Sequence, residues 1–88
     1  TYMVEGKQTG EVSLVTPDGK PYVTMDFDAP LFAIWSPEGK DAPFVCLEPW
    51  MGRCDNIGFD KEISEKPGIN KVESGETFEK EYQIVVAI

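Results

Sequence analysis

The residues best suited to chemistry lie in one short stretch, from Phe44 to Asn56. Within it, Glu48 ends an apolar run, and period-two alternation places it on the same face as Phe44 and Cys46, which we expect to point inward. A carboxylate among apolar side chains is costly unless it is paired, and desolvation raises the pKa of such a group toward neutrality. A carboxyl group in that state is suited to act as a general base.

Trp50 follows Glu48 by two residues, across a proline. An indole beside a carboxylate suits sugar recognition, because the C–H face of a pyranose stacks on an aromatic ring while a carboxylate binds hydroxyl groups. The spacing alone leaves simpler interpretations open: a solvated charge at a strand end for Glu48, and a core residue for Trp50. Asp55 is a further candidate contact, although Asp55 and Asn56 are most simply an Asx turn.

The chain lacks the residues that other common kinds of catalytic or metal-binding site require. The chain has no histidine, so a Ser–His or Cys–His nucleophile cannot be built from it alone. The two cysteines, Cys46 and Cys54, are most simply reduced thiols of a cytoplasmic protein, with one disulfide left open. Two cysteines without a histidine do not match a zinc site, and the aspartates lack the spacing of a calcium loop. We therefore expect no metal.

The composition of the chain limits the kinds of molecule that it can bind. The 88 residues include 8 basic and 16 acidic side chains, giving a net charge of −8, which argues against binding to nucleic acid or to an anionic membrane. Apolar residues make up 41% of the chain, too many for a disordered protein, yet no apolar run reaches the ~18 residues of a membrane span. The chain begins at Thr1 and is small, so we expect a fragment of a longer protein.

The elements that would position these residues are short strands separated by turns that contain proline and glycine. The strongest signal is a hairpin around Pro17–Lys20, where Pro-Asp-Gly favours a tight turn. An 18-residue loop from Trp50 to Pro67 follows the candidate cluster, and loops of that length commonly serve binding or catalysis. The expected strands are Glu11–Thr16, Pro21–Phe27, Leu31–Trp35 (buried on both faces), Phe44–Leu47, Asn70–Glu73 and Thr77–Ile88. This pattern indicates an all-β protein, an antiparallel β-sandwich or part of one.

Two parts of the sequence resemble a known family. The run from Leu31 to Trp35, followed by Ala-Pro-Phe-Val-Cys-Leu-Glu-Pro-Trp-Met-Gly over residues 42–52, resembles the C-terminal part of the aldose 1-epimerase (galactose mutarotase) family. Its bacterial mutarotase-like branch is the most similar. Residues 66–69 and 73–78 resemble the turn into the family's last strand. The resemblance covers about the last 60 residues.

The resemblance implies a large antiparallel β-sandwich of the galactose mutarotase type, in which residues 1–88 form a single β domain, the C-terminal portion. It implies that Glu48 is the catalytic base and that the substrate is an aldohexose such as galactose or glucose. Trp50 and Asp55 are the residues that we expect to contact substrate. The reaction interconverts α and β anomers by acid–base ring opening and needs no cofactor. The family's histidine acid comes from upstream segments, so we expect this chain alone to be inactive.

Two other interpretations stay open at this point. The chain could be a non-catalytic carbohydrate-binding β-sandwich, in which Trp50 and Trp35 stack against sugar. It could also be a structural domain in which Glu48 is only a surface charge. In either case, a piece of a sandwich exposes sheet edges and apolar faces, so we expect self-association in isolation.

Overall fold

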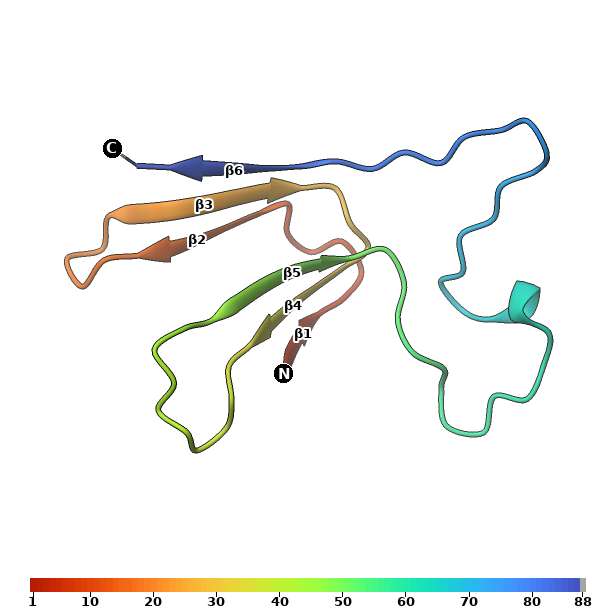
Figure 1. Ribbon diagram of the computed structural model, residues 1–88, viewed down its shortest axis with the longest axis horizontal. Coiled ribbons are helices and arrows are strands. Elements are labelled where there is room, and N and C mark those ends of the chain that lie inside the picture. Colours follow the sequence, from red (N-terminus) through yellow and green to blue (C-terminus); the bar gives the residue numbers. More distant parts are fainter. Residues whose placement is uncertain (88) are drawn as a thin grey trace.

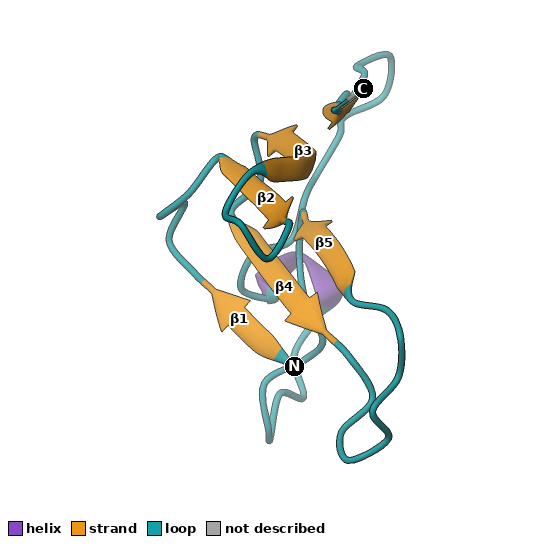
Figure 2. Ribbon diagram, turned by 90° about the vertical axis from the view of Figure 1, so that its left-hand side faces the viewer, coloured by secondary structure: helices purple, strands orange, loops and turns teal. Residues whose placement is uncertain are grey.

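The computed structural model describes residues 1–87 and contains six strands and one short 3₁₀-helix (Figure 1). The strands form two three-stranded antiparallel sheets, which confirms the expected all-β sandwich class. The first sheet has the order β1-β4-β5 and the second has the order β2-β3-β6; Figure 2 shows β1, β4 and β5 side by side in one layer. The elements are β1 (Tyr2–Val4), β2 (Glu11–Val15), β3 (Pro21–Phe27), β4 (Leu31–Trp35), β5 (Cys46–Trp50), η1 (Ile63–Glu65) and β6 (Tyr82–Val86).

The hairpin of β2 and β3 forms where the Pro-Asp-Gly turn predicts it. The amide of Gly19 donates to the carbonyl of Thr16 at 2.8 Å, and Gly19 has a φ of 84°, which favours glycine. Across the two strands, the Ser13 and Thr24 hydroxyl groups lie 2.7 Å apart. The pairing of the two strands shifts register between Leu14 and Val15. β2 ends at Val15, one residue before the expected end of the strand.

Three further expected strands differ from the observed ones. β5 begins at Cys46 and continues through Pro49 to Trp50, because an edge strand can include a residue without an N–H donor. Residues 70–73 form no strand, so that prediction is wrong; no strand pairs with them in residues 1–87. The last strand covers only Tyr82–Val86, the residues that pair with β3, and Ile88 lies outside the described residues. The short strand β1 was not expected from the sequence.

The core lies between the two sheets, close to the connection from β3 to β4. Phe27 and Phe32 stack with ring centroids 4.5 Å apart and planes inclined by 13°. Phe32 is the largest fully buried side chain, and Met25 and Ala29 complete the buried cluster. Five half-buried side chains pack around it: Val4, Val12, Ile34, Leu47 and Met51. The face of the first sheet that carries Phe32 is its inner face, and we call the opposite face the outer face.

The sandwich is open rather than compact. The accessible surface is 7134 Å², about 2,000 Å² more than the roughly 5,200 Å² expected for a compact chain of this mass. The Cα radius of gyration is 16.2 Å, whereas a compact domain of this length would have about 12 Å. A large apolar surface therefore stays uncovered, notably on β6, whose five residues are all exposed.

The only helical segment in residues 1–87 is η1, a single turn that is far too short to cross a lipid bilayer.

Candidate functional site

Glu48 lies in the middle of β5, directly opposite Ala33 of β4. Its neighbour Leu47 pairs with Ile34 and packs against the core. Because successive residues of a strand point to opposite faces, Glu48 belongs to the outer face of the first sheet. The expected inward orientation of Glu48 is therefore wrong. The register of β5 against β4 directs Leu47 to the core, and a carboxylate cannot occupy that position without a large desolvation cost.

The outer face gathers the residues that the sequence singled out. Residues opposite each other in an antiparallel pair share a face, so three cross-strand pairs form successive rows on it. These rows are Trp35 with Cys46, Ala33 with Glu48, and Leu31 with Trp50. Glu48 thus lies between two tryptophan rows, each one step of about 7 Å away along the strand. Trp35 also contacts Phe44, at 6.0 Å between ring centroids.

Glu48 and Trp50 are held together by a hydrogen bond. The indole Nε1–H of Trp50 donates to Oε1 of Glu48 at 3.2 Å, and both side chains are half-buried. In residues 1–87, the second carboxylate oxygen of Glu48, Oε2, accepts no hydrogen bond from another protein group. The arrangement fixes the carboxylate at the N–H edge of the indole and leaves one oxygen available to a ligand hydroxyl. The sequence-based pairing of these two residues is thus present, while their roles stay predictions.

Asp55 lies apart from this pair. It is exposed in the loop after β5 and forms an ion pair with Lys66, at 3.3 Å between Oδ1 and Nζ. Within residues 1–87 it makes no hydrogen bond or ion pair with Glu48 or Trp50. It lines a shallow cavity of about 370 Å³ beside η1, together with Phe59 and Ile63. The proposed substrate contact of Asp55 therefore remains a prediction that this geometry does not support directly.

A second cavity, of about 360 Å³, lies where β5 ends. Arg53 and Asn56 contribute polar groups to it, and Leu31, which pairs with Trp50, forms part of its wall. Amide and guanidinium donors in a cavity wall are suited to binding hydroxyl groups. Sequence reasoning missed Arg53 and Asn56 as site residues, although both belong to the same stretch as Glu48 and follow it by five and eight positions.

The loop around this cavity is braced by contacts between distant residues. Arg53 forms an ion pair with Glu5, which follows β1. Asn70 donates from Nδ2 to the carbonyl of Met51 at 2.7 Å. A side chain at Gly52 would place its Cβ 3.4 Å from the carbonyl oxygen of Gly68, so the chain approaches closely there. Residues 51–62 form no helix or strand, as expected for the loop that follows the candidate cluster. Polar contacts hold this loop in place.

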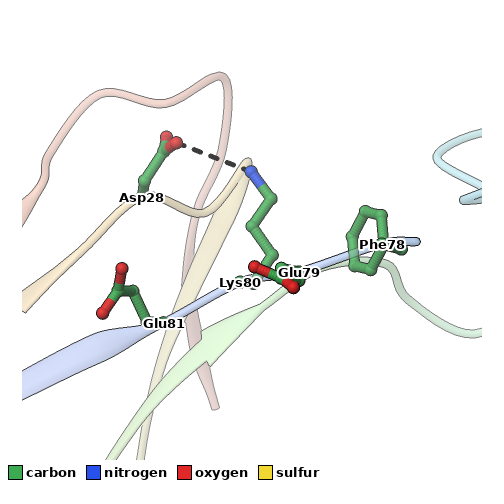
Figure 3. A pocket seen from close by; sticks show the side chains of 5 residues that line it. All are labelled: Asp28, Phe78, Glu79, Lys80 and Glu81. Carbon is green, nitrogen blue, oxygen red and sulfur yellow. Dashed lines mark hydrogen bonds and ion pairs between the residues drawn. The ribbon is translucent and has the colours of Figure 1, made fainter.

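A larger, open cavity of about 780 Å³ lies ahead of β6 and includes none of the candidate residues (Figure 3). Asp28 lies beside Lys80 there, at 3.5 Å, and forms a closer ion pair with Lys7, at 2.9 Å. The hydrogen bond and positive charge of Lys7, with a further contribution from Lys80, hold the pKa of Asp28 below its usual value. These contacts tie the segment before β6 to the corner between β3 and β4.

Replacing Asp28 with asparagine should lower the thermal midpoint slightly at pH 7 and leave it unchanged at low pH. A carboxyl group whose pKa is depressed by folding stabilises the protein above its unfolded pKa, about 3.9, and loses that effect as the pH falls through the lower folded value. Circular dichroism melts from pH 2 to 7 would measure the difference, with Asp60→Asn as the control. A difference between Asp28→Asn and the parent chain that persists at pH 2 would contradict this account.

Comparison of the sequence with those of known proteins finds two relatives. Over 63 residues, 70% of the chain, the sequence is 35% identical to the chromosomal and to the plasmid form of Protein LacX of Lactococcus lactis subsp. lactis. The chain is similar to LacX. The matched segment amounts to 21% of each LacX protein, so the chain spans about a fifth of their length. No family profile and no solved structure matches the chain.

Proposed function

We propose that this chain is the C-terminal portion of a larger β-sandwich of the aldose 1-epimerase type, and that it supplies the catalytic base, Glu48. The observation that carries the proposal is the hydrogen-bonded pair of Glu48 and Trp50, with Oε2 of Glu48 unpaired in the described residues. The resemblance of residues 31–52 to the family supports it. The partial match to LacX supports a polypeptide about five times the matched length.

The proposed reaction uses Glu48 to move one proton. Its carboxylate takes the proton from the anomeric hydroxyl of an aldohexose such as galactose or glucose. As the carbonyl forms at C1, the bond from C1 to the ring oxygen breaks, and an acid protonates that oxygen. The open-chain aldehyde rotates about the bond between C1 and C2 and closes from its other face. On closure the acid takes its proton back from the ring oxygen, and Glu48 returns its proton to the anomeric oxygen, so the reaction consumes nothing and needs no cofactor.

The acid must come from outside this chain, because the chain contains no histidine. The surplus of exposed surface supports the same idea, since a complete sandwich would cover much of it. We therefore expect the chain alone to bind sugar and not to accelerate anomer exchange.

The test compares two proteins: the 88-residue chain, and a polypeptide of LacX length that includes it. Freshly dissolved α-galactose or α-glucose approaches its anomeric equilibrium with a rate that polarimetry measures. The longer polypeptide should accelerate that approach, whereas the chain alone should leave the rate at its value in buffer. If the longer polypeptide gave no acceleration with any aldohexose, the epimerase proposal would be wrong.

A carbohydrate-binding module without catalysis is the second candidate function. Trp35 and Trp50 favour it, because they share the outer face on either side of Glu48 and neither is fully buried. The two aromatic platforms are separated by four residues along the strands, about 14 Å, which suits two separate rings of an oligosaccharide. Sugar binding by the longer polypeptide without anomer exchange would favour this second function over the first.

The binding step can be followed through tryptophan fluorescence, since the chain contains two tryptophans. We expect galactose or glucose to change the emission of the parent chain and of Trp35→Phe, and to leave that of Trp50→Phe unchanged. The Trp50→Phe change replaces the indole with a smaller ring and releases the Glu48 carboxylate that it positions, so Kd should rise about fivefold, the equivalent of about 1 kcal/mol of lost sugar contact. Equal Kd values for the two variants, measured by calorimetry, would exclude Trp50 as the main contact.

A further inference from the structure

Ala33 is the smallest side chain on the outer face of the first sheet, and it lies directly beside Glu48. It belongs to β4, the middle strand, which runs between β1 and β5 (Figure 2). Ala33 pairs with Met3 on one side and with Glu48 on the other. Along β4, Leu31 and Trp35 precede and follow it on the same face. Four longer side chains therefore surround its methyl group.

Ala33 is fully buried although it faces away from the core. Its exposed fraction is 0%, whereas the side chain of Glu48 is half-buried. The Cβ atoms of residues opposite each other in an antiparallel pair are about 4.5–5.5 Å apart, so the Glu48 side chain starts beside this methyl group. A fully enclosed position has no free volume for further carbon atoms. A larger side chain at residue 33 would therefore have to displace a neighbour.

Trp50 holds the Glu48 carboxylate from a second direction, along β5. Its Nε1–H donates to Oε1 of Glu48 at 3.2 Å, and Oε2 has no protein partner within residues 1–87. An indole N–H is a donor only, so it does not compete with Glu48 for a proton. A hydrogen bond to an ionised acceptor is also stronger than one between neutral groups. The indole thus distinguishes the two oxygens of Glu48.

We propose that Ala33 and Trp50 are positioning residues for Glu48; this role rests on the proposed function, in which Glu48 is the base. Ala33 acts through its small size, which keeps the space beside the carboxylate open. Trp50 acts through its N–H, which binds Oε1 and directs Oε2 toward the anomeric hydroxyl. Neither residue exchanges a proton with the sugar.

Loss of this positioning should appear in kcat rather than in KM. Proton transfer needs the base within hydrogen-bond reach of the hydroxyl, and a misplacement of about 1 Å can cost about 10²-fold in rate. Sugar binding depends on several contacts, so it tolerates a small movement of one carboxylate. A fall in kcat at nearly constant KM is therefore the result that a positioning role predicts.

The first test observes the indole N–H of Trp50 by NMR in the 88-residue chain. Its two tryptophans give two indole N–H signals, and Trp35→Phe identifies the one from Trp50. Glu48→Ala shows where that signal lies without the hydrogen bond. Ala33→Val should move the signal toward that position, because valine displaces the carboxylate.

The matched control is Ala29→Val. Ala29 is 2% exposed, so it is as buried as Ala33, but it belongs to the core cluster between the sheets. The same two carbon atoms are added, and overpacking should destabilise both variants, which unfolding in urea measures. Only Ala33→Val should move the indole signal. An unchanged signal in folded Ala33→Val would overturn the role of Ala33.

The second test measures kcat and KM by polarimetry in a LacX-length polypeptide that contains this chain. Ala33→Val should lower kcat about tenfold or more, with KM within about twofold of the parent value. Ala33→Ser adds a single atom and should show a smaller loss, while Ala29→Val should keep the parent kcat. If kcat followed the urea midpoints of these variants instead of the size of residue 33, the role would be structural and the proposal wrong.

The third test removes only the N–H of Trp50, by placing 3-benzothienylalanine at this position. Sulfur then takes the place of the N–H, and the size of the ring system is kept. We expect kcat to fall about tenfold and KM to stay near the parent value, since the aromatic face for the sugar is retained. An unchanged kcat would overturn the role of Trp50.

Failure of the positioning role can be told apart from failure of the proposed function. If the parent LacX-length polypeptide did not accelerate anomer exchange, the proposed function would be wrong. The indole signal of the 88-residue chain does not depend on activity, so it would still decide whether Ala33 and Trp50 hold the Glu48 carboxylate. A parent that is active and variants that keep its kcat would leave the proposed function standing and reject the positioning role.

Discussion

Replacing Glu48 with glutamine should reduce anomer exchange by about 10²–10⁴-fold in a LacX-length polypeptide that contains this chain, the range for loss of a positioned general base. Glutamine has nearly the same shape, and its amide oxygen can still accept the hydrogen bond from Trp50. It cannot take a proton from the anomeric hydroxyl. The fold and sugar binding should therefore survive while the rate falls, and polarimetry or NMR line-shape analysis of the anomers would measure that rate.

The matched control for this substitution is Glu38→Gln, in the exposed connection between β4 and β5. It removes one negative charge of the same type and should leave the rate unchanged. A titration of tryptophan fluorescence with sugar separates loss of binding from loss of proton transfer. Full activity in Glu48→Gln would show that another residue is the base, whereas equal losses in both variants would point to net charge instead of a specific carboxylate.

Replacing Phe32 with alanine should destabilise the chain by about 3–5 kcal/mol, the usual cost of removing a buried aromatic side chain. Phe32 is 1% exposed and is the largest side chain fully buried between the sheets. Its stacking on Phe27 would also be lost. Small domains have total stabilities of only about 5–15 kcal/mol, and this chain has a small core. The variant should thus be largely unfolded or have a much lower midpoint in urea, followed by circular dichroism.

Phe78→Ala is the control for this prediction, because it removes the same side chain from a position that is 45% exposed. Its cost should be below about 1 kcal/mol, as is usual for surface positions. If the two variants unfolded at similar urea concentrations, the stacked pair of Phe27 and Phe32 would not be the main support of the fold.

Local patterns were enough to predict much of the fold. The hairpin of β2 and β3 follows from a Pro-Asp-Gly turn between two runs of β-forming residues. β4 follows from the apolar run Leu31–Trp35. These features depend on conformational preferences within a few residues. By contrast, residues 70–73 contain one strong β-former, Val72, and no strand pairs with them within residues 1–87, so the backbone hydrogen bonds that would define a strand are absent there.

The candidate site was predictable in part for the same reason. The spacing of Glu48 and Trp50 marked them as a candidate pair, but they share a face because β5 continues through Pro49 to Trp50, beyond the expected strand end at Leu47. Arg53 was not predicted, because its partner Glu5 is 48 positions away in the sequence. A contact of that separation depends on how the end of β5 passes β1, and no local pattern contains that information.

The sequence by itself determined that the chain is all-β, where its main turns fall, and that a carboxylate and an indole lie two residues apart. Only the tertiary structure decided that both belong to β5 and which face they occupy. Leu47 and Glu48 alternate in any strand, and the pairing of Leu47 with Ile34, beside Phe32, directs the apolar residue to the core and the carboxylate outward. The free energy that makes this choice comes from burying apolar side chains against a second sheet, and such contacts form only when distant segments meet.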